Sequence, residues 1–212
     1  RNVSLNIGCI ESFMHHVMRP LIERYNDKLV SCKVLRGISP RLLKDFDNDD
    51  IDIFISALPF YERSDLHRIF LYSEPTVFIV PKHTLKPILS WKELVQSDLP
   101  FLLGAPESTD GKLSRNYFNK LQFRFNGRVS IDDYATTFDL IANGFGWTLQ
   151  TPLTLSSFSQ YLEDVRILLM PAPVSSRDFF VITRTNEECV RMAEDVSRIL
   201  SEIILMTIVP KT

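Results

Sequence analysis

The sequence has 212 residues, a mass of 24.5 kDa and a formal net charge of −2 at pH 7. This length is enough for one large domain or for two domains of roughly 100 residues, each with its own hydrophobic core. Acidic and basic residues are mixed along the chain and no Lys/Arg-rich segment is present, so the composition argues against a nucleic-acid-binding surface on this chain.

The sequence carries no signal for membrane insertion or export. The longest apolar runs are too short to span a bilayer and no signal peptide is found, so we expect a cytoplasmic protein without a membrane partner. The three cysteines are an odd number without CxxC spacing, which argues against a disulfide scaffold and a zinc site. Because a strand follows Arg1 almost at once, we expect a fragment that begins at a domain boundary.

The first predicted strand and helix organise the N-terminal half. Apolar residues alternate with polar ones from Val3 to Ile7, as in a strand that Gly8 ends, and a helix begins near Ser12. The apolar face of this helix consists of two rows and is wider than packing on one side of a sheet requires. One row is therefore expected to pack on a partner, and burial of both rows within the same domain is the alternative. The two rows are Phe13, Val17 and Leu21, and Met14, Met18, Ile22 and Tyr25.

Strands and helices then alternate along the first half. A strand is expected over 30–36, followed by a short helix opened by Ser39 and a β-branched strand over 51–57. This succession is typical of a doubly wound α/β sheet. An extended stretch over 66–72 and a strand over 76–81 follow, and the prolines that bracket the latter indicate a crossing into a second unit.

The second half repeats this strand–turn–helix design. Its helices are marked by a capping box at Ser90, by a polar turn over 107–110, and by Asp132 or Asp133 with Gly144 at the far end. A second capping box, which begins at Thr185, opens the last helix. The strands predicted in this half cover 101–103, 129–131, 145–152, 166–170 and 179–183.

No motif of a known catalytic site is present. Because GxSxG, HExxH, P-loop and GxGxxG patterns are all absent, we expect neither an enzyme nor a bound cofactor. Asp45, Asp47 and Asp49 match the start of a calcium loop, but Asp50 stands where that loop needs glycine and Ser56 where it needs glutamate. We therefore expect no metal site.

Polar helix starts and strand ends remain as a candidate site. In open α/β sheets small ligands bind outside the carboxyl ends of the strands, where N–H groups of helix N-termini favour an anion or a polar group. Four such segments predict a small-ligand site, and the alternative is that each is only a capping motif. A redox sensor at Cys9 is a further alternative, although no resolving cysteine lies nearby in the sequence. The candidate ligand-binding residues are Cys9, Ile10, Glu11, Ser12, Ser56, Ala57, Ser108, Thr109, Thr151 and Pro152.

Six segments, in this order and spacing, resemble the effector-binding domain of LysR-type transcriptional regulators. They are LNIG at 5–8, PLIERY at 20–25, DIFIS at 52–56, VFIVP at 77–81, SWKEL at 90–94 and LIANGFGWTLQTP at 140–152. The resemblance implies an α/β fold like that of type 2 periplasmic solute-binding proteins, with two Rossmann-like lobes around a cleft. Residues 1–75 and the C-terminal helix over 185–212 are expected in lobe I, and residues 76–184 in lobe II.

The same resemblance implies a function. A small-molecule effector would bind between the lobes and control DNA binding by a missing N-terminal helix-turn-helix domain, through a shift in conformational populations. A homodimer or tetramer is expected, and a solute-binding protein of a transporter is the alternative. The family commonly pairs side by side, and the dimer-interface residues expected on the first helix and on the helix over 134–142 of its partner are Phe13, Val17, Leu21, Tyr134, Phe138 and Ile141.

Overall fold

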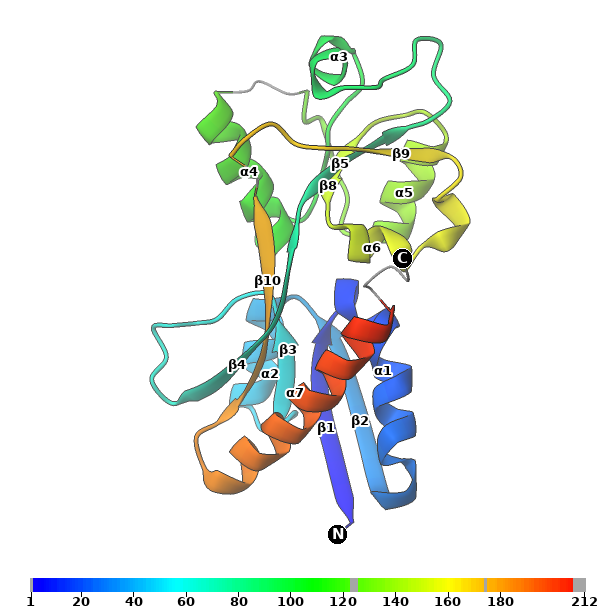
Figure 1. The fold of residues 1–212 in the computed structure, drawn as a ribbon. Coiled ribbons are helices and arrows are strands. Elements are labelled where there is room, and N and C mark those ends of the chain that lie inside the picture. Colours follow the sequence, from blue (N-terminus) through cyan, green and yellow to red (C-terminus); the bar gives the residue numbers. More distant parts are fainter. Residues whose placement is uncertain (1, 123–125, 174, 208–212) are drawn as a thin grey trace. The chain divides into compact units, whose positions relative to one another are not determined.

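The computed structural model describes residues 2–122, 126–173 and 175–207 (Figure 1). The chain divides into two compact units. Unit 1 contains residues 1–73 and 178–212, and unit 2 contains residues 74–177. Among the described residues, no helix combines the length and the apolar character that crossing a bilayer requires.

Unit 1 is built on a five-stranded mixed sheet. Its strand order is β2-β1-β3-β10-β4, in which β1 pairs in parallel with β2 and β3, and β10 is antiparallel to β3. The strands are β1 (Val3–Ile10), β2 (Leu29–Gly37), β3 (Ile53–Ser56), β4 (Leu66–Pro75) and β10 (Ser176–Arg184). All four residues of β3 are buried, as expected for a central strand that is covered on both faces.

Three α-helices pack on this sheet. They are α1 (Glu11–Tyr25), α2 (Ser39–Asp47) and α7 (Glu187–Thr207), and a 3₁₀-helix, η1 (Asn26–Lys28), follows α1. In Figure 1 α1 and α7 lie beside each other, and the Tyr25 hydroxyl donates a hydrogen bond of 2.5 Å to Asp195 on α7. The Phe13 ring packs on Phe179 of β10 at 4.9 Å between ring centroids.

Unit 2 contains a three-stranded antiparallel sheet of order β8-β5-β9 and a parallel pair of β6 and β7. Its strands are β5 (Val77–Pro81), β6 (Leu102–Leu103), β7 (Val129–Ser130), β8 (Thr148–Gln150) and β9 (Val165–Leu168). Its helices are α3 (Trp91–Gln96), α4 (Thr109–Leu121), α5 (Tyr134–Ala142), α6 (Pro152–Ser156) and the 3₁₀-helix η2 (Ser159–Tyr161).

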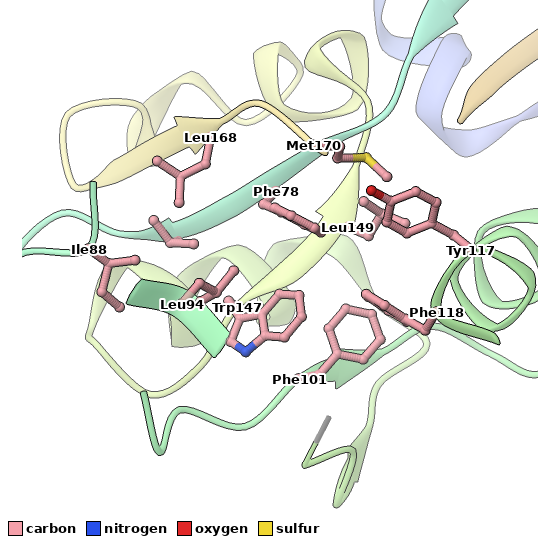
Figure 2. Close-up of a cluster of buried hydrophobic side chains, with 11 residues drawn as sticks. Phe78, Ile88, Leu94, Phe101, Tyr117, Phe118, Trp147, Leu149, Leu168 and Met170 are labelled. Carbon is pink, nitrogen blue, oxygen red and sulfur yellow. The ribbon is translucent and has the colours of Figure 1, made fainter. Parts of the chain in front are cut away.

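Strand β5 separates two hydrophobic clusters, because successive side chains of a strand point to opposite faces. Phe78 and Val80 belong to one cluster, whereas Val77 and Ile79 belong to the other, which contains Phe138 and Ile141 of α5. Figure 2 shows the first cluster, in which the Trp147 indole lies among aromatic rings such as those of Phe101 and Phe118. The Trp147 ring centroid is 4.7 Å from that of Phe101.

Several capping predictions are confirmed. Ser90 and Glu93 form the complete capping box at the start of α3, and the Asp133 carboxylate accepts a hydrogen bond from the Thr136 N–H at 2.7 Å. Gly144 follows α5 with a φ of 80°, a conformation that glycine adopts without strain.

Two predicted element boundaries are corrected. Strand β1 does not end at Gly8 but continues to Ile10, and Gly8 is needed because a Cβ atom there would lie 2.5 Å from the Ile51 side chain. The last helix is capped by Asn186 rather than Thr185, since the Asn186 carboxamide oxygen accepts a hydrogen bond of 3.0 Å from the Cys189 N–H.

The second boundary between the units also differs from the sequence prediction. The family resemblance predicts that the strand over 179–183 belongs to lobe II, which it places at residues 76–184. In the structure Phe180 to Thr183 pair with β3, in the sheet of unit 1. The boundary therefore lies after Arg177, because β10 pairs with strands of the five-stranded sheet of unit 1 and not with the sheet of unit 2.

The predicted dimer-interface residues are a further correction. Phe13, Val17 and Leu21 have no exposed surface, and neither have Phe138 and Ile141, since all five pack inside their own unit. Tyr134 is partly buried, and its hydroxyl is bonded to Asp110. Side chains without accessible surface cannot form an interface, so burial within the same domain is the correct interpretation of Phe13, Val17 and Leu21 and of Phe138 and Ile141.

Candidate functional site

The unit 1 residues of the predicted site lie together. Strands β1 and β3 run in parallel with Cys9 opposite Ile55, so both strands end at the same edge of the sheet. Helix α1 begins directly after β1, with Ile10 as its N-cap residue. Cys9, Ile10, Glu11 and Ser12 are therefore neighbours of Ser56 and Ala57, which follow Ile55 at this edge.

Ser12 differs from the other buried serines at this edge. The Ser56 hydroxyl donates to the Leu58 carbonyl at 2.7 Å, and the Ser39 hydroxyl accepts from the Ala57 N–H at 3.0 Å. Ser12 is only 1% exposed, and its hydroxyl has no hydrogen-bond partner among the described residues. The side chain of Ile10, the N-cap residue of α1, makes no capping hydrogen bond to the N–H groups of the first turn.

Neither the Glu11 charge nor the Cys9 thiol beside Ser12 is available for chemistry of its own. Glu11 forms an ion pair with Arg36 at 2.8 Å, so the acidic residue in the turn after β1 is compensated. The Cys9 thiol is fully buried and donates to the Ile10 carbonyl at 3.4 Å. Burial raises the pKa of Cys9, which keeps the sulfur protonated and argues against a redox sensor there.

The unit 2 residues of the predicted site form a second group. Ser108 caps α4 by accepting from the Gly111 N–H at 3.0 Å, and Thr151 caps α6 by accepting from the Thr154 N–H at 3.3 Å. A hydrogen bond of 2.9 Å from the Gln150 amide to Asp110 joins the end of β8 to the first turn of α4. The structure thus brings Thr151 and Pro152 close to Ser108 and Thr109, although the two hydroxyls are already used as caps.

A buried polar cluster joins these segments, and the sequence analysis missed it. Asp110 lies at its centre, where one carboxylate oxygen is 3.0 Å from the Arg177 guanidinium. The other oxygen accepts hydrogen bonds from the Tyr134 hydroxyl at 2.5 Å and from Gln150. Burial and the neighbouring Asp110 charge raise the pKa of Tyr134, so this hydroxyl stays a donor.

Glu74 completes this cluster, which we call the Asp110 cluster and which consists of Glu74, Asp110, Tyr134, Gln150 and Arg177. Its Oε2 atom accepts a hydrogen bond of 3.2 Å from the Leu153 N–H. The Oε1 atom is buried without a hydrogen-bond partner among the described residues. Burial raises the pKa of Glu74, with Arg177 opposing that shift and Asp110 adding to it.

One sequence signal could have revealed the Asp110 cluster. Glu74 and Arg177 are charged residues at the two places where the chain passes from one unit to the other, and both are almost completely buried. Charged side chains are rarely buried without a partner. A charged residue where the chain passes between the units therefore suggests an ion pair there. In the part of the chain that the structure describes, no three His, Cys, Asp or Glu side chains are grouped as metal ligands would be.

The class of the protein follows from these features. Two α/β units, connected by two crossings of the chain and carrying buried polar groups at strand ends and helix starts, define a fold of the two-lobed periplasmic-binding-protein type. The family model "LysR substrate binding domain" matches residues 2–202. The chain belongs to this family and is an effector-sensing domain of a LysR-type transcriptional regulator. No curated protein sequence matches it.

Solved structures agree with the fold. The reduced regulatory domain of OxyR2 from Vibrio vulnificus has a TM-score of 0.78 at 16% identity, over 95% of this chain and 96% of that chain. The effector-binding domain of QuiR in complex with shikimate has a TM-score of 0.76 at 14% identity, over 93% and 96%. Full-length OxyR from Pseudomonas aeruginosa has a TM-score of 0.78 at 16% identity, over 99% of this chain and 71% of that chain.

Proposed function

We propose that the effector is recognised at the strand ends and helix starts of both units. In unit 1 the recognition residues are Cys9, Ile10, Glu11, Ser12, Ser56 and Ala57. In unit 2 they are Ser108, Thr109, Thr151 and Pro152, supported by the Asp110 cluster. The chain acts by binding and not by catalysis, which is consistent with a family of regulatory domains.

The observation that carries this proposal is the start of α1. A helix N-terminus exposes N–H donors and the positive end of the helix dipole, which attract a negatively charged or carbonyl oxygen. At α1 the N-cap side chain of Ile10 makes no hydrogen bond to these donors, and the Ser12 hydroxyl beside them is buried without a partner among the described residues. Arg36 compensates the only acid of the first turn, so an acceptor group of the effector, such as a carboxylate, fits here.

The wider regulator is part of the same proposal. A helix-turn-helix domain outside this sequence would contact the DNA, and the net charge of −2 and the lack of a basic segment in the sequence are consistent with this division. The chain acts in the cytoplasm as a homodimer or tetramer. Met14 and Ile22 of α1 have partly exposed side chains, and we expect them in the interface in place of the buried row. Sedimentation at micromolar concentration should give at least twice the chain mass.

The unit 1 site is tested with simple anions. Sodium benzoate, shikimate and sulfate, each at millimolar concentration, should be titrated into the wild-type chain while its melting temperature is followed. At least one should raise it, and Ser12→Ala should weaken that binding about tenfold or more, because a hydrogen bond to a charged group is lost. The control Ser31→Ala removes an exposed hydroxyl of the same unit and should bind as the wild type does.

Two results would contradict this proposal. One is that none of the three anions changes the melting temperature. The other is that Ser12→Ala binds the stabilising anion as tightly as Ser31→Ala does, because the α1 start would then be an ordinary helix end.

A further inference from the structure

The helix starts of unit 2 differ from that of α1, because side chains of the same unit occupy them. The Ser108 hydroxyl accepts from the first turn of α4, in which Asp110 also places a carboxylate. The start of α6 is occupied by the Thr151 hydroxyl and by Glu74, whose carboxylate accepts from the Leu153 N–H. An anionic group of a ligand would meet these carboxylates in place of free N–H donors.

When Glu74 is ionised, the charges of the Asp110 cluster do not balance. It contains two carboxylates, Glu74 and Asp110, and one guanidinium, Arg177, whereas Tyr134 and Gln150 are neutral. Asp110 has partners on both oxygens, but Glu74 uses only Oε2. A buried carboxylate with an unpaired oxygen is costly, and a hydrogen-bond donor removes that cost.

We propose that Glu74 is a specificity-determining residue of unit 2, and that its Oε1 atom accepts a hydrogen bond from a cationic group of the effector, an ammonium or an amidinium group. This inference rests on the proposed function, since it names the ligand chemistry of the unit 2 residues. A hydroxyl group satisfies the free oxygen but leaves the charge uncompensated. A cation satisfies both, and in a poorly solvated site the second contribution is large.

The proposal implies a link between binding and pH. Burial raises the pKa of Glu74, so part of the protein carries a neutral Glu74 at pH values where an exposed glutamate is ionised. A cation binds the ionised form and displaces the proton. Its affinity should therefore rise with increasing pH through the Glu74 pKa and level off above it. The other groups of the cluster are Asp110, Arg177, Tyr134 and Gln150.

The test uses probes that share one ring and differ in charge. Benzylamine, benzamidine, benzyl alcohol and benzoate should be titrated into the isotopically labelled wild-type chain and followed by NMR. We expect the two cations to bind and to shift signals of Thr151 and Leu153. Glu74→Gln should weaken their binding about tenfold or more while the alcohol is little affected. The control Glu163→Gln removes an exposed acid of unit 2 and should leave cation binding unchanged.

Glutamine has the shape of glutamate and can still accept from the Leu153 N–H, so the variant should fold, which its melting curve will check. The wild-type chain provides an independent measurement, because benzylamine affinity should rise with pH as argued above. The inference is overturned if neither cation binds, if both bind Glu74→Gln and Glu163→Gln equally well, or if their wild-type affinity falls with increasing pH. If anion binding still depends on Ser12, the proposed function stands although the inference on Glu74 fails. If no anion binding depends on Ser12, the proposed function and the inference both fail.

Discussion

Two buried serines at the same sheet edge show how position decides the role of a residue. Ser56 donates to the Leu58 carbonyl and accepts from the Leu58 N–H, so its hydroxyl stabilises the turn after β3. Ser12 is equally buried but has no such partner among the described residues. A buried hydroxyl without a hydrogen bond lowers the free energy of unfolding. Such unpaired groups are found at ligand-binding sites, where a ligand can supply the missing hydrogen bond.

Leucines at two positions test the burial of α1 at the residue scale. Leu21 is 0% exposed and Leu205 of α7 is 65% exposed. Leu21→Ala should lower the free energy of unfolding by about 2–5 kcal/mol, because it leaves a cavity in the core of unit 1. The matched change Leu205→Ala should alter it by no more than about 0.5 kcal/mol. Urea denaturation measures both, and equal effects would contradict the core assignment of this row.

Single helices depend on their caps, and α3 is the clearest case. It has only one or two turns, yet Leu94 is buried against the aromatic cluster of unit 2, as Figure 2 shows. The Glu93 carboxylate accepts from the Ser90 N–H at 3.0 Å, and the Ser90 hydroxyl accepts from the Glu93 N–H. These bonds satisfy backbone donors that a short helix otherwise leaves to water.

Removing this cap should destabilise unit 2. Ser90→Ala is expected to lower the free energy of unfolding by about 0.5–2 kcal/mol, as N-cap serines generally contribute. Ser130→Ala is the control, since Ser130 is exposed on β7. Thermal denaturation followed by circular dichroism compares the two variants, and an unchanged melting temperature for Ser90→Ala would show that packing of Leu94 alone holds α3.

The whole molecule consists of one continuous and one discontinuous unit. Unit 2 is a single stretch, residues 74–177, with both of its hydrophobic clusters inside it. Unit 1 needs residues 178–212, because β10 pairs with β3 and α7 packs on α1. The two units therefore place different demands on the chain.

Fragments should reveal this difference. The fragment 74–177 should fold alone and unfold cooperatively, because its cores and the Asp110 cluster are complete. The fragment 1–73 should lack a cooperative transition, because Phe13 loses Phe179 and Tyr25 loses Asp195. Circular dichroism melting curves measure both, and a cooperative transition of 1–73 would show that β10 and α7 are dispensable.

The sequence by itself determined the local structure and the family. The capping box at Ser90, the Asp133 cap and the Gly144 turn depend on residues within a few positions of one another, so their signals are complete in a short window. The ordered segments between 5 and 152 identified the effector-binding domain, and the family model agrees. The same patterns placed polar residues at strand ends, which the fold brings together within each unit.

Only the tertiary structure decided which distant residues meet. An apolar row such as Phe13, Val17 and Leu21 has the same spacing whether it faces its own core or a partner, so its burial depends on where β10 and α7 return. Likewise Asp110 and Arg177 are far apart in sequence, and neither shows in its own segment that they form a buried pair. Contacts of this kind depend on the path of the whole chain, which no local pattern contains.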